Sequence, residues 1–310
     1  MKRFIIFIIA VLLFSSCSGI NKKNSLEEKG LVPLLSFVFD DGNDTDHSIA
    51  GEVFKEHHAT ASFAITTGFI NTKNYLSSFQ ILELQNNGFE IMSHTVTHPN
   101  LRSLDKKQLE FELSSSKTAL ENIGARVKNL VYPYNMNNSL VREVAAKYYR
   151  SARGGRRMMN TASLEKYELK SYPASHNLNK MKALIDRAYA EKKWLMLYYH
   201  NLDIKVRVSP DNSGTFLAGE ELLFSPSGAR GRYSKELFSW LYFLPVSGRP
   251  QAGDTITGQT IGATCHLDEI IYNDKEDIGE LIEYMHSRYP DMKIVTIDQG
   301  LDIYKVRSEE

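Results

Sequence analysis

The sequence has little of three features that define other classes of protein. Its 310 residues include two cysteines, Cys17 and Cys265, too few for a disulfide framework or a cysteine-rich zinc site. Its 37 basic and 37 acidic residues balance, so no general field attracts nucleic acid or an anionic membrane surface. The apolar run Phe4–Phe14 is too short for a stable transmembrane helix. A bound metal would therefore be held by histidine and carboxylate.

The first 30 residues have the pattern of an export leader followed by a polar segment. Residues 1–16 begin with Lys2 and Arg3 and continue into the apolar run, which indicates a signal peptide. The run ends at small residues around Cys17, and this resembles the lipobox of bacterial lipoproteins, in which the cysteine becomes the lipidated first residue. An ordinary cleaved signal peptide with a chance cysteine is the alternative. Residues 17–30 are polar without periodicity, so we expect a flexible tether.

From residue 31 onward, short apolar runs alternate with longer segments of helical spacing. The predicted strands are Leu34–Phe39, Thr60–Thr66, Phe89–Met92, Leu130–Tyr132, Tyr149–Ala152, Tyr167–Ser171, Trp194–Tyr199 and Lys293–Ile297. The predicted helices are His47–His57, Ser77–Asn86, Asp105–Ile123, Ser139–Lys147, Lys180–Lys192 and Lys275–Tyr289. This alternation predicts an α/β fold with a mostly parallel sheet and helices outside, and seven or eight units indicate a barrel or a distorted barrel.

Residues 201–274 interrupt the alternation. They carry eight of the 19 glycines and four of the nine prolines. Because a turn-rich stretch of this length is uncommon as a plain connection, we interpret it as an insertion with some β structure and an apolar helix-like patch at Glu236–Leu244. Its aromatic residues are suited to stacking on sugar rings, but packing of a small subdomain is the simpler explanation.

Two carboxylates follow the first predicted strand. Asp40 and Asp41 close the apolar run Leu34–Phe39, and buried carboxylates at this point would repel each other unless a cation compensates them. Gly42 lets the chain turn at once, so both side chains can face one pocket. Taken alone, the triplet is more often a turn on the surface.

Three histidines follow other predicted strands. His94 and His98, at spacing i and i+4, would share one face of a helical turn that Pro99 ends, and together they can hold one ion. Solvated or capping histidines are the alternative. His200 ends the apolar strand Trp194–Tyr199, where a barrel keeps its active site, although a lone histidine is often a satisfied buried residue.

Four segments in this order resemble the successive motifs of the polysaccharide deacetylase family, carbohydrate esterase family four: FVFDDG, SHTVTH, VYPYN and the apolar strand ending in His200. HATASFAITTGFI and KIVTIDQGLDIY resemble the family's second and closing strands. The likeness covers about residues 34–200 and 275–304. It implies that residues 31–310 form a distorted (β/α)7–8 barrel with a Gly/Pro-rich insertion at about 201–274.

The resemblance also implies an activity and roles for single residues. The activity is metal-dependent removal of acetyl groups from an N- or O-acetylated glycan. The implied metal ligands are Asp41, His94 and His98, and the ion is Zn²⁺ or one of Co²⁺, Ni²⁺ and Mn²⁺. The implied catalytic groups are Asp40 as general base, His200 as general acid and the backbone N–H of Tyr134 as a donor to the developing oxyanion.

The sequence departs from the family pattern at two positions. Val131 stands where many members have an arginine that orients the base, and no aspartate is clearly placed to support His200. Arg153 and Arg156 could supply the positive charge from elsewhere, or they are exposed loop residues. His266 is a rival for the general acid, but its surroundings are mixed whereas the strand before His200 is apolar.

The lipobox and the motifs together predict a protein of the bacterial cell envelope. It would be lipid-anchored, at the periplasmic or outer-membrane face, with an acetylated glycan as its partner. Two other functions stay open: a glycan-binding lipoprotein that keeps the barrel without catalysis, and a metal-dependent esterase or amidase acting on a non-carbohydrate acyl substrate. The sequence gives no oligomeric state and does not distinguish N- from O-deacetylation.

Overall fold

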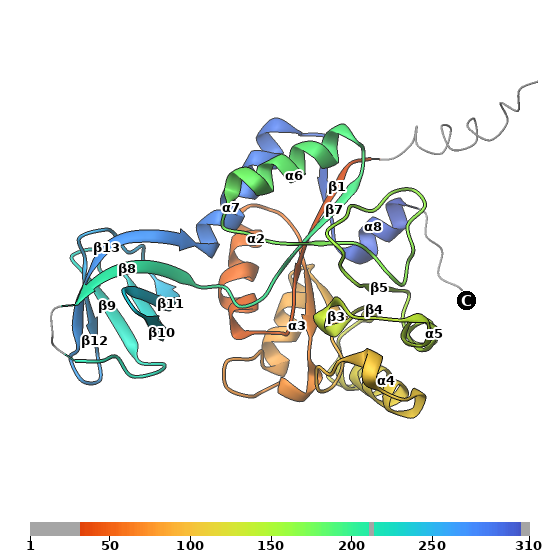
Figure 1. Ribbon diagram of the computed structural model, residues 1–310, viewed down its shortest axis with the longest axis horizontal. Helices are drawn as coiled ribbons and strands as arrows, with labels where there is room; N and C mark the ends of the chain where they lie inside the picture. The colour runs from red at the N-terminus through yellow and green to blue at the C-terminus, as the bar shows by residue number, and fades with distance from the viewer. Residues whose placement is uncertain (1–31, 211–213, 305–310) are drawn as a thin grey trace, which may run out of the picture. The chain divides into compact units, whose positions relative to one another are not determined.

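The computed structural model describes residues 32–210 and 214–304. One parallel sheet organises the larger part of this chain (Figure 1). Its strands are β1 (Leu34–Phe39), β2 (Ser62–Ile65), β3 (Glu90–Ser93), β4 (Val127–Val131), β5 (Ser151–Arg153), β6 (Tyr172–Pro173), β7 (Trp194–Tyr199) and β14 (Lys293–Ile294). They follow the order β5-β4-β3-β2-β1-β7-β6, and β14 also pairs with β1. The fold is therefore the expected α/β class, with a curled parallel sheet in place of a regular barrel.

β1 is the central strand. All six of its residues are buried, as is typical of a parallel strand covered on both faces. It pairs in parallel with β2 on one side and β7 on the other. Because parallel strands end at the same edge of a sheet, the residues that follow β1, β3 and β7 are brought to one edge.

Helices connect successive strands, and capping side chains set where several of them begin. They are α2 (Glu52–Glu56), α3 (Ser78–Asn86), α4 (Lys106–Asn122), α5 (Ser139–Ala146), α6 (Leu178–Ala190), α7 (Asp274–Arg288) and α8 (Ile297–Ile303), and a π-helical turn at Asp46–Gly51 precedes α2. Ser77 and Asp105 form capping boxes at the starts of α3 and α4. The side chain of Asn177 accepts a hydrogen bond from the backbone N–H of Lys180, so α6 begins two residues before the predicted start.

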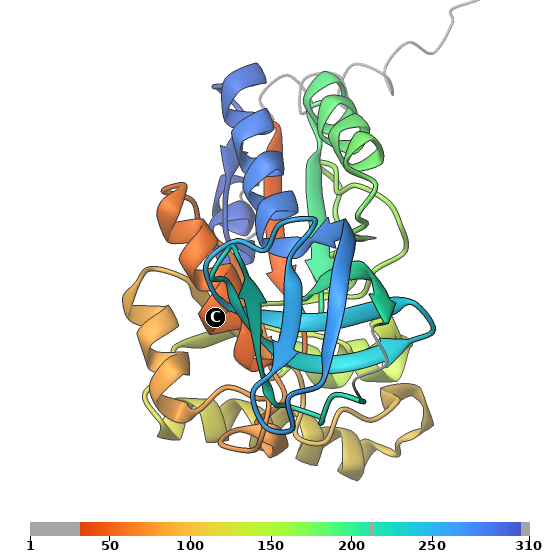
Figure 2. The ribbon, with the colours of Figure 1, turned by 90° about the vertical axis from the view of Figure 1, so that its left-hand side faces the viewer.

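Residues 204–210 and 214–273 form a second, closed β structure, whose strands are visible in Figure 2. Its strands are β8 (Ile204–Pro210), β9 (Glu221–Ser225), β10 (Arg230–Leu237), β11 (Trp240–Ser247), β12 (Thr255–Gly258) and β13 (Thr264–Asn273). They close in the order β10-β11-β8-β13-β12-β9 around a hydrophobic cluster of their own. Closure removes exposed strand edges, so this small barrel has the features of a separately packed unit.

The helix-like interpretation of Glu236–Leu244 is wrong. These residues belong to β10 and β11, which form an antiparallel hairpin, and Phe238 lies between them with φ 58°. Leu241 and Phe243 are buried while their neighbours are more exposed, which is the two-residue period of a strand. The alternation of buried apolar and more exposed residues therefore agrees with two strands, and the helical spacing seen in the sequence does not correspond to a helix.

The predicted strand at Tyr167–Ser171 is also wrong. Only Leu169 forms a β-bridge there, to Arg153, and the strand of this region is the short β6 that follows. In the described part of the chain no helix is long and apolar enough to cross a bilayer. The predicted leader at 1–16 and tether at 17–30 lie outside the described residues.

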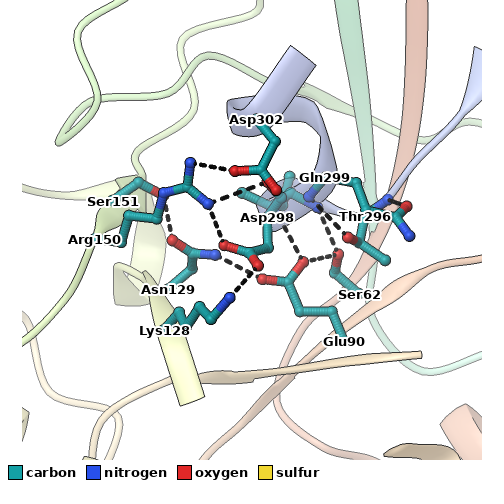
Figure 3. A network of polar contacts seen from close by, with 11 residues as sticks. Ser62, Glu90, Lys128, Asn129, Arg150, Ser151, Thr296, Asp298, Gln299 and Asp302 are labelled. Atoms are coloured by element: carbon teal, nitrogen blue, oxygen red, sulfur yellow. Dashed lines mark hydrogen bonds and ion pairs between the residues drawn. The ribbon is translucent and has the colours of Figure 1, made fainter. Parts of the chain in front are cut away.

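The edge of the sheet at which the strands begin is closed by a polar network around Glu90 (Figure 3). The carboxylate of Glu90 accepts hydrogen bonds from Ser62 Oγ (2.7 Å), Asn129 Nδ2 (2.7 Å) and the backbone N–H of Asp298 in α8 (3.1 Å). Burial raises the pKa of Glu90, and these hydrogen bonds oppose the rise. The network therefore attaches the last helix to the starts of β2, β3 and β4.

Replacing Glu90 by glutamine tests this attachment. The amide offers one accepting oxygen and turns an NH₂ group toward donors, so we expect the Glu90→Gln variant to lose about 1–3 kcal/mol of unfolding free energy. Urea denaturation followed by circular dichroism measures it. The matched control is Glu165→Gln at an exposed position, which should change stability by less than about 0.5 kcal/mol. Equal stability of the two variants would contradict a structural role for the network.

Candidate active site

Asp40 and Asp41 have different backbone conformations directly after β1. Asp40 is buried, and its backbone N–H still donates to the carbonyl of Tyr199 (2.9 Å), as in the β1–β7 pairing. Asp41 has φ 80° and Gly42 has φ 79°. The turn thus begins at the aspartate, one residue before the glycine that the sequence suggested, and a non-glycine residue in this region is strained.

The loop after β3 carries His94 and His98, and it is not the helical turn that their spacing predicted. Thr95 has φ 71° and His98 has φ 58°, and these left-handed conformations are incompatible with a right-handed helix. The hydroxyl of Thr95 accepts a hydrogen bond from the backbone N–H of His98 (3.0 Å). The expected pairing of the two imidazoles is nevertheless formed, by loop geometry in place of helix geometry.

Glu112 of α4 holds this loop from behind. Its nearly buried carboxylate accepts hydrogen bonds from the backbone N–H groups of Val96 (2.8 Å) and Thr97 (3.0 Å) and from the hydroxyl of Thr97 (2.7 Å). Glu112 is not among the functional residues predicted from the sequence. The available signal was a glutamate on the apolar face of its helix, between Leu109 and Leu113, where a charged side chain needs a buried partner.

Asp41, His94 and His98 converge on one point. Asp41 Oδ1 lies 3.4 Å from His94 Nε2 and 3.3 Å from His98 Nε2. His94 Nδ1 donates to the backbone carbonyl of Val131 (2.8 Å), which fixes its tautomer and leaves Nε2 facing Asp41. Asp41 Oδ1 is buried and accepts no hydrogen bond. This oxygen and the two imidazole nitrogens are a donor set that fits a divalent transition-metal ion.

The electrostatics of these three residues suit metal binding. Burial raises the pKa of Asp41, but His94, His200 and His98 outweigh it, so the pKa of this carboxyl lies below its ordinary value. Burial, followed by the neighbouring His94, lowers the pKa of His98. At neutral pH both groups are therefore in the deprotonated form that can act as a ligand.

Arg153, at the end of β5, pairs with Asp40. Its guanidinium Nη2 donates a short hydrogen bond to Asp40 Oδ2, and the arginine side chain is fully buried. Nη1 donates to Asn135 Oδ1 (2.7 Å) and Ser171 Oγ (3.0 Å), and the guanidinium lies 4.7 Å from the centroid of the Tyr198 ring. The arginine missing at Val131 is thus supplied by a neighbouring strand.

The other arginine considered for this role does not reach the site. Arg156 is 69% exposed and pairs with Glu168 at 3.1 Å. The interpretation of Arg153 as an exposed loop residue is wrong, whereas the same interpretation is confirmed for Arg156. The signal in the sequence was that Arg153 directly follows one predicted strand, as the carboxylate pair follows another.

Tyr134 follows β4 in a left-handed conformation, with φ 56°. Its ring lies edge-on to His98, with centroids 4.7 Å apart, and its side chain is 60% exposed. The strained backbone brings this residue next to the three candidate metal ligands.

His200 and His266, the two rivals for the general acid, lie in different parts of the fold. His200 directly follows β7, and its charge influences the pKa of both Asp41 and His98. His266 lies on β13 of the small barrel, where its Nδ1 is 3.3 Å from Thr255 Oγ1. Only His200 is therefore at the edge of the sheet where Asp41 lies. Among the described residues, no carboxylate is hydrogen-bonded to His200.

Comparison with known proteins gives a match to polysaccharide deacetylases in the part of the chain that carries Asp40, Asp41, His94 and His98. Residues 29–151 match the family model described as polysaccharide deacetylase. A chitooligosaccharide deacetylase of Azorhizobium caulinodans is 32% identical over 116 residues, which are 36% of this chain and 53% of that protein. YxkH of Bacillus subtilis is 28% identical over 111 residues, which are 36% of this chain and 40% of that protein. The chain thus spans about half or less of the length of these curated relatives.

A solved structure supports the fold over most of the chain. The Xyl-CE4 domain of a multidomain xylanase from the hindgut metagenome of Trinervitermes trinervoides has a TM-score of 0.50 and 12% identity. The match covers 90% of this chain and 94% of that one. The chain accordingly shares its fold with that domain, and the curled α/β sheet is consistent with the distorted barrel that the motifs implied.

Replacing Arg153 by methionine tests its role as the partner of Asp40. The variant leaves a buried carboxylate without its cation, so we expect a loss of about 3–5 kcal/mol in unfolding free energy. Arg156→Met, which removes an exposed pair, should cost less than about 1 kcal/mol. In the double variant Arg153→Met, Asp40→Asn the loss should be smaller than in Arg153→Met alone. Strictly additive effects in this double-mutant cycle would show that the two residues are not coupled.

Proposed function

We propose that this protein is a metal-dependent deacetylase of an N- or O-acetylated glycan. The observation that carries the proposal is the convergence of Asp41, His94 and His98 beside the Asp40–Arg153 pair. The three candidate ligands and Asp40 lie within residues 29–151, which match the polysaccharide deacetylase family model. The name of the Azorhizobium relative makes an N-acetylated oligosaccharide the first substrate to test.

Asp41, His94 and His98 would hold the ion, most simply Zn²⁺, with Co²⁺, Ni²⁺ or Mn²⁺ as alternatives. A bound divalent ion lowers the pKa of an attacking water and polarises the acetyl carbonyl. Two hydrogen-bond acceptors orient these ligands before the ion binds. The carbonyl of Val131 orients His94, and the carboxylate of Glu112 holds the loop of His98.

Asp40 is the proposed general base. Arg153 holds its Oδ2, and Oδ1 is buried without a hydrogen bond, so Oδ1 is the oxygen that would accept the proton of the attacking water. Because Asn135 and Ser171 in turn hold Arg153, the carboxylate keeps one orientation in the folded protein. Arg153 is a positioning residue in this scheme.

His200 is the proposed general acid. In its protonated form it would donate a proton to the leaving amine or alcohol as the acetyl group departs. The backbone N–H of Tyr134 is the proposed donor to the oxyanion that forms on the acetyl carbonyl, and its side chain would border the substrate.

Arg153 also bears on the alternatives. A glycan-binding protein without catalysis is suggested by Val131, where an arginine is usual, and by the lack of an aspartate that supports His200. Arg153 provides the charge that position 131 lacks, so the first of these two reasons no longer favours the alternative. An esterase or amidase acting on a non-carbohydrate acyl group would use the same residues, so the choice of substrate distinguishes it.

Acetate release is the direct test of the proposed activity. The purified chain should release acetate from N-acetylated or O-acetylated oligosaccharides, lose the activity with a chelator and regain it with Zn²⁺. Asp40→Asn should lower kcat by about 10²–10⁴-fold because it removes the base. If metal-loaded protein releases acetate from neither class of oligosaccharide, the proposal fails.

The same assay separates the two candidate acids. His200→Ala should lower kcat by about 10²–10⁴-fold, whereas His266→Ala on the small barrel should leave kcat and KM unchanged. The reverse result would transfer the role of acid to His266.

We further propose that the mature chain begins at a lipidated Cys17 and lies at the periplasmic or outer-membrane face of a bacterial envelope. The leader and the small residues around Cys17 support this. Expression in bacteria with a radiolabelled fatty acid should label the wild type and leave Cys17→Ser unlabelled. Equal labelling of the two proteins, or labelling of neither, would contradict lipidation at this residue.

A further inference from the structure

Three side chains outside the active site form a second group of metal-binding type. His176 precedes α6, and Asp274 and Asp277 lie three residues apart in the first turn of α7. Their donor atoms all lie within 4.8 Å of one another, as those of Asp41, His94 and His98 do. The two groups share no residue, and the proposed reaction uses none of these three side chains.

The distances within this group are those between ligands of one ion. His176 Nδ1 lies 3.3 Å from Asp274 Oδ1 and 3.5 Å from Asp277 Oδ2. By contrast, the hydrogen-bonded pair of His47 Nε2 and Glu83 Oε2 is 2.9 Å apart. Metal–ligand bonds of about 2.0–2.2 Å in tetrahedral geometry separate ligand atoms by about 3.3–3.6 Å. The group therefore has the spacing of the proposed catalytic metal site.

The environment leaves the carboxylate oxygens of this group available. Asp277 Oδ2 is buried and accepts no hydrogen bond. Asp274 is largely buried, and its Oδ2 accepts from the backbone N–H of Asp203 (2.9 Å), which orients the carboxylate as the surroundings of a metal ligand usually do.

The imidazole of His176 is held by the ring of Tyr272. The two rings are stacked 3.5 Å apart and nearly parallel, and Tyr272 OH donates to Asp203 Oδ1 (2.8 Å). The His176 side chain is 46% exposed, so the histidine of this group is accessible to solvent. Two partners from different parts of the chain thus fix the orientation of the imidazole and of one carboxylate.

We propose that His176, Asp274 and Asp277 bind a second divalent transition-metal ion. One imidazole nitrogen and two carboxylate oxygens suit Zn²⁺, Co²⁺ or Ni²⁺, and water would complete the coordination. The ion joins the loop before α6 to the first turn of α7. Its neighbours Asp203 and Tyr272 lie at the two chain connections of the small barrel, so the ion stabilises the region where β8 begins and β13 ends.

A protonated His176 between the two carboxylates is the competing arrangement. Burial lowers the pKa of His176, but Asp274 and Asp277 outweigh it and raise the pKa to about 9. An ion that occupies the group displaces this proton, because Nδ1 cannot bind both. The protonation state of the ring in the presence of metal therefore discriminates between the two arrangements.

The number of metal ions bound per chain tests the proposal. The protein is first treated with a chelator and dialysed, and Zn²⁺ or Co²⁺ alone is the probe. Isothermal titration should give two equivalents for the wild type and one each for His176→Ala and Asp277→Asn. His98→Ala should also bind one equivalent, held by the second group. His286→Ala, an exposed histidine of α7, is the matched control and should bind two.

Proton–nitrogen NMR of the imidazole rings gives an independent readout. With saturating Zn²⁺ at pH 7.5, the His176 ring should show a single protonated nitrogen, Nε2. Unchanged stoichiometry in both His176→Ala and Asp277→Asn, or a fully protonated His176 ring with Zn²⁺, would overturn the proposal. A wild type that binds one equivalent, lost in His176→Ala but kept in His98→Ala, would support the second site while contradicting the proposed catalytic metal.

Discussion

Adjacent carboxylates at the end of a buried strand impose the constraint on which this site depends. Asp40 and Asp41 follow the fully buried β1, and each needs compensation for its charge. Arg153 compensates Asp40, while the imidazoles of His94 and His98 face Asp41. The strained turn at Asp41 makes this division possible, because it sends the two side chains to different partners.

The remaining contacts of the site keep these partners in position. Glu112 fixes the loop between the two imidazoles from α4, and Asn135 and Ser171 fix Arg153. At the opposite edge of the sheet, the network of Glu90 attaches α8 to the strand starts. One edge of the sheet therefore has a strained turn and buried carboxylate oxygens without hydrogen bonds, whereas at the other edge the carboxylate of Glu90 accepts three hydrogen bonds.

The pattern of apolar residues predicted helices and strands correctly wherever it agreed with the tertiary contacts. The apolar run of β1 and the strand Trp194–Tyr199 agree with the structure, and so do most helices, because buried strands and capped amphipathic helices carry their signal in adjacent residues. Glu236–Leu244 was mistaken for a helix because nine residues contain too little periodicity to separate two short strands from one helix. The loop of His94 and His98 was wrongly predicted to be a helical turn. The residue types threonine and histidine do not reveal that the backbone is left-handed at these positions.

The sequence by itself determined the residue types of the site, their order and the strands that they follow. Its resemblance to the polysaccharide deacetylase family also implied that a charge was missing at Val131. Only the tertiary structure decided that Arg153 supplies this charge, that Glu112 supports the loop, and that His176 meets Asp274 and Asp277 across about 100 residues of chain. The physical reason is that a buried charge is satisfied by whichever side chain the packing brings within a few ångströms, and these side chains are far apart in the sequence.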